Sequence, residues 1–316
     1  MSVPRPVAMR QTLSSRAAPL SVGTRQTRQT LANRTAREYN IGMAEERKKR
    51  AAAICAAAAT FAVGLGLTVF EAVANDKLFG GDPPVAFTLG MSAAERLLLA
   101  AAVVCVSVLL GFGRLFTPRI KGGVIAFTAA AAVALANFPF FTLAGGELTF
   151  TANAGETALF LLNCAAIGAF EESAFRGLLL PLLFGAMKDR RYAGIFAAIL
   201  SAAVFALFHL LNLISGAGAG ATLLQVGYTF LTGCMFGALT LLTRSVIPGA
   251  VAHALFDVGG TMTAYGVAAG ANWNVPSVVI MAVVSAAAGL YLLIATVRRT
   301  LLRPYILTDD EPRGDV

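Results

Sequence analysis

Six ionisable side chains lie inside long apolar stretches of the 316-residue sequence, and they include both of its histidines. They are Glu171, Glu172, Arg176, His209, His253 and Asp257. A charged group at the centre of a bilayer costs about 2.5–3.5 kcal/mol on insertion scales, so helices that carry such groups turn them toward one another. The default interpretation is a functional site buried inside a membrane.

The spacing within each stretch predicts which side chains share a helix face. Glu172 and Arg176 are four residues apart, so we expect a structural ion pair between them. Glu171 is rotated by about 100° around the helix from Glu172, so it lies outside this ion pair and remains available for another role. His253 and Asp257 repeat the four-residue spacing, which directs an imidazole and a carboxyl group to one point.

These residue types suit the hydrolysis of an amide bond, which needs an activated water on one side and hydrogen-bond donors for the developing oxyanion on the other. The same residues permit a second mechanism, in which His209, His253 and Glu171 bind Zn²⁺ and the metal activates its water. No His-Glu-x-x-His helix supports the zinc mechanism. We therefore favour glutamate catalysis, which requires no cofactor, and keep zinc as the alternative.

Membrane-spanning helices must position these residues, because 57% of the chain is hydrophobic and only 13% is charged. Eight apolar stretches are long enough to cross about 30 Å of hydrocarbon. They lie at about 51–74, 97–113, 122–145, 157–186, 193–216, 221–243, 246–266 and 275–297. The predicted fold is an all-α, polytopic transmembrane helical bundle of about eight spans within residues 47–300.

Basic residues alternate between the connections in a way that predicts topology. Clusters precede the first span and follow the second, fourth, sixth and eighth, whereas the opposite connections hold only Lys77 and Arg96. Both termini should therefore face the positive side. The net charge of +8 then reports membrane orientation rather than nucleic-acid binding. The partners that we expect are the lipid bilayer and a membrane-associated protein or peptide substrate.

The two ends of the chain have the composition of polar extensions. Residues 1–46 form a disordered, basic segment with seven arginines and no acidic residue before Glu38, as in an organellar transit peptide. A plastid membrane is the favoured location. The alternatives are a bacterial plasma membrane, where the segment would be a basic cytosolic tail, and the endoplasmic reticulum. Residues 301–316 form a polar C-terminal tail.

Three short motifs resemble a known family. Glu171-Glu172-Ser173-Ala174-Phe175-Arg176, Phe205-Ala206-Leu207-Phe208-His209 and His253-Ala254-Leu255-Phe256-Asp257 are similar to the EExxxR, FxxxH and HxxxN/D motifs of the CAAX-protease and bacteriocin-processing family of intramembrane proteases. The order of the motifs, on three separate spans, adds specificity to each one. The resemblance covers about 155–265 and leaves the N-terminal spans unmatched.

The resemblance implies a role for each residue. Glu171 would be the general base, His209 would help to hold and activate the water, and Glu172 with Arg176 would give support. His253 and Asp257 would face the carbonyl oxygen of the scissile bond. Asparagine at position 257 would donate a hydrogen bond, whereas aspartate donates only when protonated, so Asp257 instead could orient His253.

The implied function is an intramembrane endopeptidase acting on a membrane-associated, in some relatives prenylated, protein. A non-proteolytic membrane protein is the alternative, either an ion-coupled transporter or a binding or scaffold relative of the family.

The depth of each residue along its helix tests in part whether these residues can form one site. At about 1.5 Å per residue, Glu171, His253 and Asp257 share one level, provided that Pro181 kinks its helix, while His209 comes out about 10 Å deeper.

Overall fold

The computed structural model describes residues 83–302, apart from 121–122, 188–189 and 215, and scattered positions between 27 and 80. Most of the predicted transit peptide, most of the predicted span 51–74 and the tail from residue 303 onward lie outside the described residues. The chain divides into two units, Met1–Ala51 and Ala52–Val316, and the fold below is that of the second unit.

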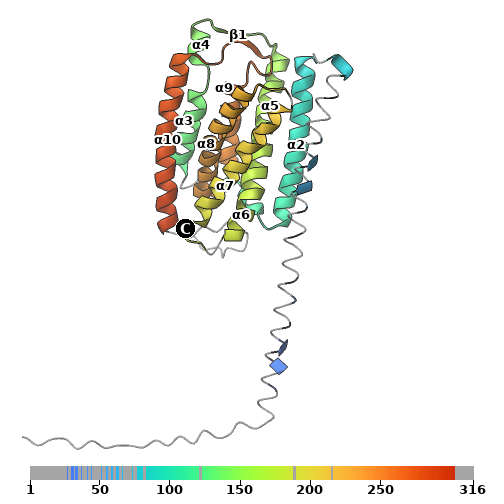
Figure 1. Ribbon diagram of the computed structural model, residues 1–316, viewed down its shortest axis with the longest axis vertical. Coiled ribbons are helices and arrows are strands. Elements are labelled where there is room, and N and C mark those ends of the chain that lie inside the picture. Colours follow the sequence, from blue (N-terminus) through green and yellow to red (C-terminus); the bar gives the residue numbers. More distant parts are fainter. Residues whose placement is uncertain are drawn as a thin grey trace, which may run out of the picture. The chain divides into compact units, whose positions relative to one another are not determined.

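The described residues form a bundle of apolar helices, which confirms the predicted all-α polytopic fold (Figure 1). Six stretches of this part of the chain are long and apolar enough to cross a membrane. The helices are α2 (Val85–Leu109), α3 (Val124–Ala136), α4 (Phe140–Ala144), α5 (Ala154–Glu172), α6 (Leu180–Met187), α7 (Ala193–Phe208), α8 (Ala219–Thr243), α9 (Ile247–Gly260) and α10 (Val275–Leu302).

Shorter elements link these helices. A 3₁₀ turn, η1 (Gly113–Phe116), follows α2, and a second one, η3 (His209–Leu213), ends α7. A π-helical segment, η2 (Ser173–Leu179), joins α5 to α6 into one stretch. Strands β1 (Leu148–Phe150) and β2 (Ala268–Gly270) pair antiparallel. They tie the connection before α5 to the connection after α9.

The span predicted at 97–113 begins a full three turns earlier, because α2 starts at Val85. The charged pair Glu95 and Arg96 argues against a span in the sequence, yet both residues lie in the middle of α2 and line an internal cavity. A charged side chain is tolerated in a span when it faces the bundle interior rather than lipid. The prediction that Arg96 lies in a connection is therefore wrong.

Two other predicted spans are interrupted. The stretch 122–145 is broken between α3 and α4, where Pro139 supplies no backbone donor and the Asn137 amide bonds the Phe256 carbonyl at 2.8 Å. The stretch 246–266 is helical over only 14 residues, α9, because the chain turns after Gly260 to enter β2. By length, α9 is not among the six candidate spans.

The charged ends of the described helices gather as the alternation predicts. Arg114 follows α2, Arg190 follows α6, Arg244 follows α8 and Arg299 lies near the end of α10. The C-terminal ends of α2, α6 and α10 lie at the same end of the bundle in Figure 1. The Val246 amide donates to the Leu115 carbonyl at 2.9 Å across this end. The opposite end carries α4 and β1. The described spans therefore follow the predicted up-and-down order.

Helix α5 packs against both α2 and α9, and a glycine sets one of these distances. A Cβ atom on Gly168 would lie 2.6 Å from the Ala250 carbonyl oxygen of α9, which is closer than packed atoms approach. Only glycine lets the two backbones meet here. This close approach places Glu171 and Glu172, one turn further along α5, beside His253.

Candidate active site

His253 lies at the centre of the candidate site, and its two ring nitrogens face different carboxylates. Nδ1 lies 3.0 Å from Glu172 Oε1 and, since an ionised carboxylate only accepts, Nδ1 carries the hydrogen. Nε2 lies 3.6 Å from Glu171 Oε2 and 3.7 Å from Asp257 Oδ2. The ring stacks on Phe236 with centroids 5.0 Å apart. One edge of the imidazole is fixed by a hydrogen bond, and the other lies between two carboxylates beside the cavity.

The ion pair expected between Glu172 and Arg176 is confirmed. Arg176 Nη1 lies 2.8 Å from Glu172 Oε1, and both side chains are fully buried. Nη2 of Arg176 donates to the Gly233 carbonyl of α8 at 2.9 Å. Glu172 Oε1 thus accepts from both Arg176 and His253, a link that the four-residue spacing does not reveal. The pair acts on the site by holding His253 in one orientation.

An aromatic side chain from α7 closes this part of the site. The guanidinium carbon of Arg176 lies 4.6 Å from the Phe205 ring centroid, within the range of a cation–π contact. The Phe205 ring also meets His209 edge-on at 5.0 Å and His253 at 5.9 Å. Phe205 therefore packs between the cation and both histidines.

The helix carrying both glutamates widens directly after them. Pro181 lacks a backbone N–H, and its ring would clash with the Gly177 carbonyl in a regular α-helix. The wider π-helical turns of η2 accommodate this break, and such turns recur at functional sites. The carbonyl of Phe175, inside η2, accepts a hydrogen bond from the Ser201 hydroxyl of α7 at 2.7 Å. The helix thus accommodates Pro181 by changing from α-helical to π-helical geometry in the residues before the proline.

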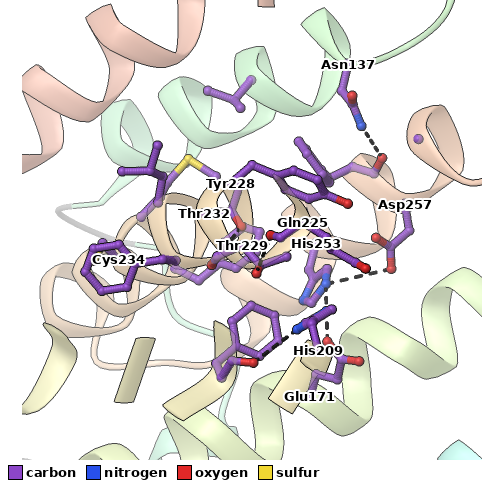
Figure 2. Close-up of a pocket in the computed structure, with 18 of the residues that line it drawn as sticks. Asn137, Glu171, His209, Gln225, Tyr228, Thr229, Thr232, Cys234, His253 and Asp257 are labelled. Atoms are coloured by element: carbon purple, nitrogen blue, oxygen red, sulfur yellow. Dashed lines mark hydrogen bonds and ion pairs between the residues drawn. The ribbon is translucent and has the colours of Figure 1, made fainter. Parts of the chain in front are cut away.

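Glu171 and Asp257 lie on the open side of His253, as Figure 2 shows. Their side chains are 22% and 13% exposed, against 0% for Glu172. Both line a cavity of about 1180 Å³, together with His209 and His253. Its other lining residues are largely apolar and come mainly from α2, α7, α8 and α10, with further residues from α3, α5 and α9. A cavity of this size can hold an extended peptide segment and an apolar group.

His209 lies on the same cavity, in η3, but it is held differently. Its Nδ1 is 3.1 Å from the Phe205 carbonyl oxygen, and since a carbonyl only accepts, Nδ1 carries the hydrogen and Nε2 is a free acceptor. Both histidines contact Phe205, so the greater depth expected for His209 does not remove it from the site. No direct hydrogen bond or ion pair joins His209 to Glu171 in the described part of the chain.

The three residues proposed as zinc ligands do not form a metal site as they stand. Within the described residues, no group of three His, Cys, Asp or Glu side chains is arranged to hold a metal ion. Glu171 and His253 approach each other, but the nearest polar atom to Nδ1 of His209 is a backbone oxygen.

The arrangement agrees with a comparison against known families. The family model described as Type II CAAX prenyl endopeptidase Rce1-like matches residues 153–259. Residues 153–259 are therefore similar to this family. No curated protein and no solved structure matches the chain.

The matched region begins at Asn153, whose side chain caps α5 by accepting from the Glu156 amide, and ends at Gly259 in α9. All six ionisable residues that the sequence singles out fall inside it. Helices α2, α3 and α10 lie outside the matched residues, although each contributes to the cavity wall.

Sequence reasoning missed several residues that shape the site. Phe236 and Gly233 of α8 contact His253 and Arg176, but an apolar side chain and a backbone carbonyl give no signal among many similar residues. Arg96 of α2 lines the cavity beside the matched residues 153–259. An arginine within an apolar stretch is a signal of an interior charge, but beside Glu95 the same residue also fits a connection between spans.

Proposed function

We propose that the protein is an intramembrane endopeptidase that hydrolyses a peptide bond of a membrane-associated protein. Prenylated proteins are the substrates that the family description suggests. The observation that carries the proposal is the convergence of the Glu171 and Asp257 carboxylates on Nε2 of His253 at the wall of a large, mainly apolar cavity. Buried charges of this kind are retained where chemistry needs them.

Glu171 is the residue placed to act as general base. Its carboxylate faces the cavity, so it can take a proton from water as the water attacks the scissile carbonyl carbon, and can then give that proton to the leaving amine. His209 can assist through Nε2, which accepts a hydrogen bond because its Nδ1 is committed to Phe205. Two acceptors would then fix both hydrogens of the attacking water.

His253 is the residue placed to stabilise the developing oxyanion. Because Glu172 holds the hydrogen on Nδ1, Nε2 donates only when the ring is an imidazolium. Glu171, Glu172 and Asp257 surround the ring with negative charge, which stabilises that form. An ionised Asp257 cannot donate a hydrogen bond to the oxyanion itself. It contributes instead by stabilising the imidazolium form of His253, whose Nε2–H is the donor.

The test is cleavage of a library of membrane-anchored peptides, with prenylated cysteine among them, by the purified protein in detergent. We expect products with the wild type and none with Glu171→Gln or His209→Ala. Arg190→Gln, at the exposed end after α6, is the control for handling and should cut as the wild type does.

The same samples distinguish glutamate catalysis from zinc catalysis, and a peptidase from a transporter. Activity that survives a chelator in metal-free protein supports glutamate catalysis, and activity that requires bound zinc overturns it. Product formation that is unchanged in Glu171→Gln contradicts the proposal. Ion flux in liposomes that depends on Glu171, without cleavage, would support the transporter instead.

A further inference from the structure

Arg96 is a cation in the cavity wall whose hydrogen-bond partners, among the described residues, are uncharged. Its Nη1 donates to the Ser92 carbonyl oxygen at 3.2 Å and to the Ser92 hydroxyl. The hydroxyl in turn donates to Asn163 Oδ1 of α5 at 2.7 Å. All of these partners are neutral, and Arg96 forms no ion pair with a carboxylate in the described part of the chain.

The position of Arg96 makes its charge unusual. It is the one Lys or Arg among the described residues that line the cavity, where Glu95, Glu171 and Asp257 give the wall negative charge. Arg96 is near enough to Asp257 to interact with it electrostatically. A guanidinium inside a membrane is expensive unless it binds something, and its planar donors match a carboxylate.

We propose that Arg96 binds a carboxylate of the peptide substrate and so selects where the chain is cut. This inference rests on the proposed peptidase activity and adds a specificity residue outside the family-matched region. The neutral contacts with Ser92 and Asn163 hold the guanidinium at the α2–α5 contact, leaving its remaining N–H groups for the substrate.

Helix geometry gives the distance between this site and the general base. Asn163, which marks the level of the Arg96 guanidinium, precedes Glu171 by eight residues on α5. At 1.5 Å per residue, this separation is about 12 Å along the helix axis. An extended peptide covers it in roughly three to four residues. The carboxylate should therefore lie about that many residues from the scissile bond.

A carboxylate at this position has two sources, the C-terminus of the substrate or an acidic side chain. Three versions of one cleaved peptide distinguish them: a free C-terminal acid, the C-terminal amide, and the amide with glutamate as its last residue. Each is assayed with wild type, Arg96→Gln, Arg96→Lys and the control Arg190→Gln. Arg190 undergoes the same chemical change as Arg96, but outside the cavity.

We expect Arg96→Gln to lower kcat/KM for the free acid by about tenfold to a hundredfold, mainly through KM, and to leave the amide within about twofold. Arg96→Lys should recover part of the loss. A loss on the glutamate peptide as well would show that acidic side chains also serve as ligands. Arg190→Gln should match the wild type on all three peptides.

Equal losses on every peptide, or no loss on any, would overturn the inference. Equal losses would mean that Arg96 only balances Asp257 or holds α2 against α5. The amide peptide separates this failure from that of the proposed function. If the wild type cleaves the amide and Glu171→Gln does not, the peptidase stands whatever Arg96 does. If no peptide is cleaved, both proposals fall.

Discussion

The two sides of His253 are built from the same residue types and behave differently. On the closed half, Glu172 and Arg176 are fully buried, paired at 2.8 Å and covered by Phe205 and Phe236. On the open half, Glu171, Asp257 and Arg96 line the cavity. The two carboxylates lie 3.6 and 3.7 Å from His253, and neither forms an ion pair with Arg96 in the described part of the chain. The difference shows how one helix turn can serve both structure and chemistry.

Adjacent residues of α5 are divided between these two halves. Glu171 and Glu172 differ by about 100° around the helix, which turns one into the cavity and the other into the protein interior. Glu172 accepts hydrogen bonds from Arg176 and His253 through Oε1, and it holds both partners in place. The cavity-facing carboxylate of Glu171 can accept a proton from water. Variants that separate these duties test the comparison.

The largest effect should follow loss of the general base in the open half. Glu171→Gln keeps the size of the side chain but removes the proton acceptor, so we expect turnover to fall by about 10²–10⁴-fold. Thermal stability in detergent should stay close to that of the wild type, because the side chain is partly exposed. A stability loss as large as that of a closed-half variant would erase the distinction between the halves.

The closed half should respond in the opposite way. Arg176→Met leaves the buried Glu172 carboxylate without its cation, which we expect to lower the free energy of unfolding by about 3–5 kcal/mol. Chemical denaturation in mild detergent measures this change. Combining it with Glu172→Gln should cost less than the sum of the single variants. Additive losses would show that the two residues do not act as a pair.

A smaller effect is expected where α5 meets α9. Gly168→Ala places a methyl group against the Ala250 carbonyl and should destabilise the protein by about 1–3 kcal/mol. Activity should fall as well, since both glutamates shift relative to His253. Gly185→Ala is the matched control, because a Cβ at Gly185 meets nothing within 4 Å. Similar melting curves for the two variants would refute the role of close helix approach.

The smallest effect is expected at Asp257. Asparagine there keeps an oxygen toward Nε2 of His253 and adds an N–H donor for the oxyanion, so turnover of Asp257→Asn should change by less than about tenfold. Asp257→Leu offers neither group and should lose more. Equal turnover in the two variants would remove Asp257 from the site chemistry.

The sequence was informative about the site because membrane burial makes charged residues rare. Glu171, Glu172, Arg176, His253 and Asp257 could be picked out by position alone, and their helical spacing predicts the Glu172–Arg176 pair that the structure confirms. The same rule misplaced Arg96. By this rule the adjacent charges Glu95 and Arg96 mark the end of a span, but the interior of a bundle also accommodates charge when it faces a cavity.

What the sequence determined by itself is the class of fold, the order of the motifs and the set of ionisable residues, because hydropathy and helical periodicity are local properties of the chain. Only the tertiary structure decided that Glu172 bonds His253, that Arg96 joins the cavity and that α9 is short. These features depend on which helices touch and how closely. That is fixed by contacts such as Gly168 against Ala250, between residues distant in the chain.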